Sequence, residues 1–282
     1  MNFLFPVLAA LLQAASFTLD KVVLSLKRVN FRTYTGISFP LIFFITLVIF
    51  MIFRPPLSLE LFSGKLGWLI FISAFLTIVT NLFFYRALDA DRLGEIQTLD
   101  LLPIIPVIIF SSLFFSDERS FFVLVPALVA SAAIIWSHWE RHHFAVAKKT
   151  LPFLIWALVA APVGAAVSKI VLTAWNPISF RLVIDGIVAV ILGPLFFKDE
   201  KRISLNGFGL LLLTNILTSI AWTLFYFSYQ RSGIVYTTLI FSLQPLLVYF
   251  TSLFFLKEPF HMKKFVAFII VLASIAIAQF TG

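Results

Sequence analysis

Apolar residues along the chain fall into ten long blocks that are separated by short polar connections. The blocks cover residues 3–26, 33–53, 66–87, 94–115, 120–138, 151–172, 179–197, 206–227, 233–256 and 264–280. Most are close to the ~20 residues that an α-helix needs to cross ~30 Å of hydrocarbon. A helix is the default spanning structure because it satisfies its backbone polar groups internally. The pattern therefore predicts an all-α integral membrane protein with ten transmembrane helices.

The composition supports a membrane location and removes several functional classes. Hydrophobic residues make up 61% of the 282 positions and charged residues only 12%, which leaves too little polar surface for a soluble globule. The net charge of +8 lies mostly in the short connections, so we interpret it as contact with anionic lipid headgroups rather than with nucleic acid. The chain has no cysteine, which excludes disulfides and thiolate metal sites.

Short sequence matches relate the two halves of the chain. LFFSDE at 113–118 resembles LFFLKE at 253–258, DKVVLS at 20–25 resembles SKIVLT at 168–173, and FFY at 83–85 resembles LFY at 224–226. The matches keep their order, so we predict a first five-helix repeat at 1–139, a basic linker at 140–150 and a second repeat at 151–282. Five crossings are an odd number, so the second repeat enters from the opposite side. Inverted repeats of this kind are typical of transporters.

The matched positions also resemble a known family. They are a Lys near the end of the first helix of each half, a Tyr closing the third, and a Glu after a Pro-containing fourth: Lys21, Lys169, Tyr85, Tyr226, Glu118 and Glu258. This pattern resembles the EamA-type ten-helix members of the drug/metabolite transporter (DMT) superfamily. The resemblance implies a secondary transporter, most often an exporter, of amino acids or related small metabolites. It also implies the plasma membrane, the inner membrane where there are two, of a bacterium or archaeon.

Prolines in the corresponding fourth and ninth helices point to a binding site near the membrane midplane. Pro103, Pro106 and Pro245 each remove a backbone donor inside an apolar span, and such interrupted helices are typical of transporter sites. A kink that serves only helix packing is the alternative. The polar and aromatic residues that we expect around a substrate are Gln97, Asp100, Gln244, Asn81, Tyr85, Lys169, Asn215, Trp222 and Tyr226. We expect the fourth and ninth helices to floor the cavity, and the first, third, sixth and eighth to wall it.

Charged residues inside the spans are expensive and are therefore functional candidates. Asp100 has no opposite charge at i±3 or i±4, so it could bind a cationic group or a proton. Lys169 could bind an anionic group, or its amine could extend to the membrane surface. Arg181 and Asp185 are spaced i, i+4 and are expected to pair with each other. We interpret Asp20 as lying near a helix end, within reach of water.

Other functions stay open at this stage. A membrane-embedded enzyme acting on a lipid or prenyl substrate is one alternative, and a membrane assembly protein without transport is another. The chain contains no GxGxxG, Walker or zinc-protease motif, and we expect no enzyme activity, cofactor or metal site. Expected partners are a small-molecule substrate and the lipid bilayer, with protons as a candidate coupling ion and a monomer or homodimer as the assembly.

The distribution of basic residues and the family resemblance disagree about orientation. Most of the 21 Lys and Arg residues lie in alternate connections that include the central linker. The positive-inside rule would place that linker in the cytoplasm and both termini outside. The family resemblance implies the reverse, so the orientation stays open.

Overall fold

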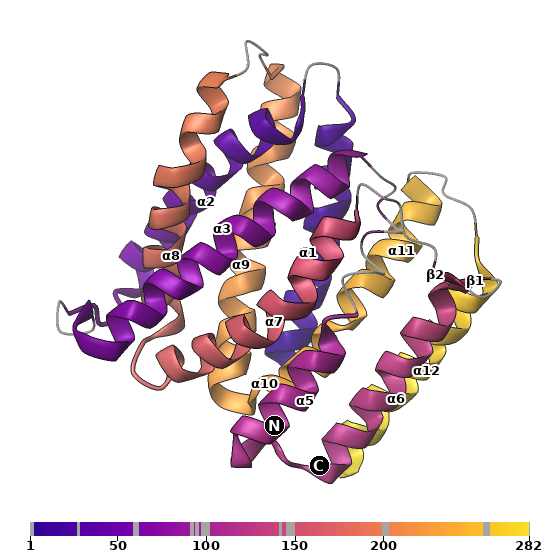
Figure 1. Ribbon diagram of the computed structural model, residues 1–282. Helices are drawn as coiled ribbons and strands as arrows, with labels where there is room; N and C mark the ends of the chain where they lie inside the picture. The colour runs from indigo at the N-terminus through magenta and orange to yellow at the C-terminus, as the bar shows by residue number, and fades with distance from the viewer. Residues whose placement is uncertain are drawn as a thin grey trace.

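The structure is a computed structural model that describes most of the chain as a helical bundle (Figure 1). It describes residues 3–26, 29–58, 62–90, 93, 96, 102–140, 143–144, 150–198, 203–255 and 260–281. The first half contains α1 (Leu4–Leu24), α2 (Phe31–Phe53), α3 (Gly64–Ala90), α5 (Ile104–Phe114), the 3-10 helix η2 (Ser116–Glu118) and α6 (Phe121–His138). The second half contains α7 (Leu151–Leu172), α8 (Pro177–Leu192), the 3-10 helix η3 (Gly193–Lys198), α9 (Leu205–Ser232), α10 (Ile234–Phe241), α11 (Leu243–Phe255) and α12 (Met262–Thr281). Two short antiparallel strands, β1 (Trp139–Glu140) and β2 (His143–Phe144), lie between the halves.

The described helices have the length and the surface of a membrane protein. Seven helical stretches in the described part of the chain are long and apolar enough to cross a membrane, and two further apolar helices are shorter. Large apolar side chains cover the outside of the bundle, among them Phe44, Met51 and Trp68, which is 74% exposed. Water would penalise such a surface, whereas lipid tails solvate it. The prediction of a helical integral membrane protein is confirmed.

Local capping explains where several helices begin. The side chain of Asn30 accepts a hydrogen bond of 2.9 Å from the backbone N–H of Thr33 at the start of α2. Asn176 caps α8 in the same way, at 2.9 Å from the N–H of Ile178, and Pro177 follows at the first helical position. Asn and Pro are favoured at these two positions because the first N–H groups of a helix lack intrahelical partners. α2 and α8, which are the second and seventh predicted helices, therefore start with the same type of cap.

The contacts between the two halves form a symmetrical pattern. α1 packs against α9 and α11, and in the same way α7 packs against α3 and α5. α2 contacts α8, while α6 and α12 form a side-by-side pair at the edge of the bundle (Figure 1). Each predicted helix of the first half has a counterpart five places later, in the second half. If every helix is exchanged for its counterpart, this set of contacts stays the same. An approximate twofold relation between the halves would produce this pattern.

Small residues allow α1 and α7 to approach their neighbours closely. Ala9, Ala10 and Ala14 of α1 are at most 3% exposed, and Ala157 and Ala165 of α7 are also buried. Lipid provides no hydrophobic force between helices, so close van der Waals contact through small side chains stabilises them instead. This places α1 and α7 at the centre of the bundle.

The ninth predicted block is two helices rather than one. α10 ends at Phe241, Ser242 forms a turn, and α11 begins at Leu243. Pro245 is the third residue of α11, where its missing N–H would lack an intrahelical partner in any case. In the first half, Pro103 is the N-cap of α5 and Pro106 is its third residue. Most of the segment before α5 lies outside the described residues.

A buried carboxylate joins α7, η2 and α10 at one end of the bundle. Glu118 accepts hydrogen bonds from the backbone N–H groups of Ile234, at 2.7 Å, and Val235, at 2.9 Å. Glu118 also forms an ion pair with Lys169, whose Nζ lies 2.5 Å from Oδ2 of Asp117. Gly233 precedes α10 with φ of 85°, and a Cβ there would lie only 2.7 Å from Oε1 of Glu118. We call Lys169, Glu118 and the first N–H groups of α10 the α10 clasp.

Glu118 of the α10 clasp caps α10 and pairs with a cation that is remote in sequence. That cation is Lys169, and it is not the neighbouring residue Arg119. Arg119 donates instead to the carbonyl oxygens of Ser112 and Leu113, at 2.8 and 2.9 Å. The Lys169 ammonium also holds the pKa of the exposed Asp117 carboxyl below its ordinary value of 3.8.

We predict that Glu118→Gln lowers the stability of the folded protein by ~1–3 kcal/mol, because a neutral amide cannot accept from both N–H groups and pair with Lys169. Thermal unfolding of the purified protein in detergent would measure the change. Asp117→Asn is the matched control, since Asp117 binds the same Lys169 but its side chain is 67% exposed. We expect a smaller change for that variant, and equal changes would contradict a role for the α10 clasp in stability.

Candidate functional site

A cavity of about 320 Å³ lies at the centre of the bundle, between the two halves. Its wall includes residues of α1, α2, α3, α5, α7, α8, α9, α10 and α11, whereas no described residue of α6 or α12 contributes. The volume falls in the range of pockets that bind small molecules. The sequence predicts walls from the first, third, sixth and eighth apolar blocks, which are α1, α3, α7 and α9 of the structure. α2 and α8 also take part.

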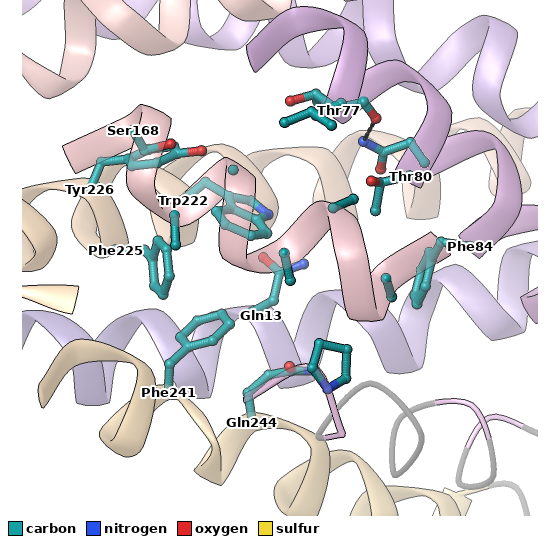
Figure 2. Close-up of a pocket in the computed structure, with 18 of the residues that line it drawn as sticks. Gln13, Thr77, Thr80, Phe84, Ser168, Trp222, Phe225, Tyr226, Phe241 and Gln244 are labelled. Atoms are coloured by element: carbon teal, nitrogen blue, oxygen red, sulfur yellow. Dashed lines mark hydrogen bonds between the residues drawn. The ribbon is translucent and has the colours of Figure 1, made fainter. Parts of the chain in front are cut away.

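Aromatic rings form one side of the cavity. Trp222 contacts Phe225 and Phe241, with ring centroids 5.0 and 5.9 Å apart, and Phe225 lies 4.6 Å from Phe241. Tyr226 and Tyr229 lie four and seven residues after Trp222, which places all three on one face of α9, and they continue the surface along that helix. Figure 2 shows Trp222, Phe225 and Phe241 gathered on this side. The rings provide a flat apolar surface with hydroxyl groups at one end.

Several polar groups are buried at the cavity without a partner among the residues that the structure describes. Both amide atoms of Gln13 are unpaired although the residue is 1% exposed, and Figure 2 shows its amide between Trp222 and Gln244. The Nε of Arg181 is also unpaired. Burying a polar group without a hydrogen bond is unfavourable, so such groups in a cavity are typical of sites that bind a polar ligand or water.

Arg181 and Asp185 form a buried ion pair in the cavity wall. Nη2 of Arg181 lies 2.8 Å from Oδ1 of Asp185, and the side chains are 7% and 3% exposed. The hydroxyl of Thr46 on α2 donates to the other carboxylate oxygen at 2.9 Å. The expected i, i+4 pair therefore forms. It also lies at the cavity, which the sequence analysis did not predict.

The structure brings most of the predicted site residues together. Those that line the cavity are Asn81, Tyr85, Trp222, Tyr226, Gln244, Pro103 and Pro245. Asn81 donates from Nδ2 to the carbonyl oxygen of Thr77 at 2.8 Å. These positions come from α3, α5, α9 and α11, four helices of both halves, so the cavity is the candidate site.

Five predicted residues are not found at the cavity. Lys169 belongs to the α10 clasp, and Pro106 lies in the first turn of α5 without lining the cavity. Asn215 is buried in α9 with an unpaired Nδ2. Gln97 and Asp100 lie outside the described residues, so their place near the site stays a prediction.

Sequence reasoning missed some residues and misjudged another. Gln13 was a detectable candidate, because it is an isolated amide within the apolar stretch AALLQAAS. The interpretation of Asp20 as a water-accessible helix-end residue is wrong, since it is 1% exposed and bound by side chains of three other helices. Those partners are remote in sequence, so neighbouring residues gave no indication of them.

A helical membrane protein with a central cavity shared by two halves has the architecture of a polytopic transporter. Residues 148–279, which span α7 through most of α12, match the model of the EamA-like transporter family. The second half of the chain is therefore an EamA-like transporter domain, and the DMT resemblance is confirmed. The match places the second half of the chain in a family of membrane transporters of the DMT type.

Comparison with solved structures supports the fold over the whole chain. One match, titled "Crystal structure of protein", has a TM-score of 0.74 at 13% sequence identity. It covers 99% of this chain and 96% of the other. At this identity the likeness shows the fold alone. None of the curated proteins matches the chain.

We predict that Asp185→Leu alone destabilises the protein by ~3–5 kcal/mol, because it leaves the buried Arg181 charge without its partner. The double variant Arg181→Met, Asp185→Leu should recover much of that loss, since it removes both charges at similar volume. Thermal unfolding in detergent would compare the three proteins. A double variant that is less stable than the single one would contradict the pairing.

Proposed function

We propose that the protein is a secondary carrier that exports amino acids or related small metabolites by alternating access. The observation that carries the proposal is the central cavity, whose wall is built from nine helices of both halves. A cavity at the interface of two similar halves can open to either side when one half rocks against the other. The EamA-like match of the second half supports the same class of activity.

The division into repeats at 1–139 and 151–282, joined by a linker at 140–150, is part of the proposal. It is supported by the corresponding contacts of α1 with α9 and α7 with α3. The Asn caps of α2 and α8 and the prolines at the third positions of α5 and α11 also correspond. Two related halves give inward-open and outward-open states of similar energy, which a carrier needs.

The character of the cavity suggests the kind of solute. Rings from Trp222, Phe225 and Phe241 suit an apolar or aromatic portion of a small molecule. The unpaired amide of Gln13 and Nε of Arg181 can bind polar groups of the same molecule. Tyr226 and Ser168 lie together at one end of the cavity, where their hydroxyls add further hydrogen-bonding groups (Figure 2). An amphipathic metabolite with one polar end and one apolar end fits this arrangement.

Proteoliposomes provide a direct test of transport. Liposomes with the purified protein would be loaded with a defined mixture of cell metabolites, and mass spectrometry would measure which solutes leave faster than from empty liposomes. The proposal expects selective loss of one chemical class. Equal retention of every solute in both preparations would overturn it.

We predict that Trp222→Ala lowers the transport rate of the selected solute about tenfold, since loss of one aromatic contact of ~1.4 kcal/mol changes an equilibrium tenfold. Trp68→Ala is the matched control, because Trp68 is 74% exposed on the outer surface and does not line the cavity. Solute efflux from proteoliposomes would compare the two variants. Similar rates for both would argue against the aromatic wall as a binding surface.

A further inference from the structure

A buried carboxylate lies beside the cavity, at the meeting point of four helices. Asp20 of α1 is 1% exposed. Its Oδ1 accepts hydrogen bonds of 2.5 Å from the hydroxyls of Tyr34 on α2 and Thr214 on α9. Its Oδ2 lies 3.4 Å from the hydroxyl of Tyr85 on α3. Three helices of the first half and one of the second half therefore meet at one carboxyl group.

No cation compensates this carboxylate within the described part of the chain. The ion pairs found there involve Lys169 and Arg181, and no Lys, Arg or His nitrogen of the described residues lies within 4.0 Å of a carboxylate oxygen of Asp20. Lys21, the next residue, directs its Nζ to the carbonyl oxygen of Leu88 at 2.6 Å. An ionised carboxylate is costly in such surroundings, so an acidic group kept there is a functional candidate. Proton uptake is the simplest way to remove its charge.

Other titratable groups around Asp20 are few. The groups that face it from neighbouring helices are the phenols of Tyr34 on α2 and Tyr85 on α3. α9 contributes the uncharged hydroxyl of Thr214. Where α11 packs against α1, Thr251 bonds to Thr18 at 2.7 Å, and both are uncharged. At neutral pH Asp20 is therefore the group in this cluster that can exchange a proton with the cavity.

A chain of hydroxyl groups connects Asp20 to the cavity. Oγ1 of Thr218, which lines the cavity, lies 2.5 Å from Oγ of Ser16. Oγ of Ser16 lies 2.7 Å from Oγ1 of Thr214, and Thr214 reaches Asp20 at 2.5 Å. Tyr85 also lines the cavity and provides a second, longer contact at 3.4 Å. Every step of the Thr218 route is short enough for a hydrogen bond.

The hydrogen bonds of this chain suit both charge states of Asp20. When Asp20 is ionised, Tyr34 and Thr214 donate to Oδ1. When a proton joins the carboxylate, the new O–H becomes a donor, and the Thr214 hydroxyl can turn its hydrogen to the carbonyl oxygen of Ser16, which lies 2.9 Å away. Each hydroxyl has one donor and two acceptor positions, so the chain can pass a proton by reversing its donors. The hydroxyls of Thr214 and Ser16 therefore keep a hydrogen-bond partner in either state.

We propose that Asp20 is a proton-binding site that exchanges with the cavity through Thr214, Ser16 and Thr218, and that its protonation couples proton movement to solute transport. The coupling rests on the proposed carrier function, whereas proton binding does not. A proton is favoured over a metal cation because two hydroxyl donors already lie at 2.5 Å from Oδ1. The sequence analysis placed the same role on Asp100.

Infrared difference spectroscopy tests proton binding without a substrate. The full-length protein in liposomes would be titrated with acid while the carboxyl C=O band is recorded. We expect a titrating band in the wild type that is absent from Asp20→Asn. Asp89→Asn is the matched control, because Asp89 lies near the same end of α3 as Tyr85 and accepts a hydrogen bond of 3.3 Å from the backbone N–H of Phe31. The band should remain in that variant.

Tyr34→Phe keeps the result interpretable if Asp20→Asn does not fold. This variant retains the carboxyl group but removes one donor to its ionised form, so the band should titrate at higher pH. An unshifted band in Tyr34→Phe, or a band that persists in folded Asp20→Asn, would overturn proton binding at Asp20.

Solute efflux with and without a pH gradient tests the coupling. Using the metabolite mixture described above, we expect the gradient to change efflux in the wild type and Asp89→Asn but not in Asp20→Asn. A gradient effect that survives in Asp20→Asn and is lost in Asp100→Asn would overturn the proposal, and so would dependence on a sodium gradient alone. If no solute moves in any preparation, the carrier function fails and the spectroscopic titration still decides whether Asp20 binds a proton.

Discussion

Hydrocarbon cannot form hydrogen bonds, so every polar group within the bundle must find its partner in the protein or in enclosed water. This constraint explains much of the interior. Ser16 and Thr214 satisfy each other across α1 and α9, and Thr46 completes the Arg181–Asp185 pair across α2 and α8. Each of these contacts joins the first half to the second. The same constraint makes the unpaired amide of Gln13 notable, because it faces a space large enough for a ligand.

The two central helices combine close contact with polar chemistry. α1 has buried alanines and packs against α9, and its polar residues Ser16 and Asp20 contact Thr214 of α9. α7 has alanines on its buried side and carries Lys169 of the α10 clasp in its last turn. The cavity lies between these helices, while α6 and α12 pack on each other away from it. The bundle thus divides into a core that surrounds the cavity and a peripheral helix pair.

The spans were predictable because membrane thickness sets their length and because their residues are apolar throughout. The Arg181–Asp185 pair was predictable for a similar reason, since i, i+4 spacing alone brings the side chains together. The surroundings of Asp20 were not predictable. Its partners Tyr34, Tyr85 and Thr214 are 14, 65 and 194 positions away, and only tertiary packing brings them to one carboxylate. Lys169 likewise pairs with Glu118, 51 positions earlier.

The α10 clasp has a consequence for motion of the halves. Any movement that separates α10 from η2 breaks the hydrogen bonds of two backbone N–H groups to the Glu118 carboxylate at the same time. Each of these groups needs a new partner at once, and only water can supply all of them. The separation is therefore tied to hydration of that end of the bundle. The free-energy cost of breaking the contacts of Glu118 depends on whether water can reach them.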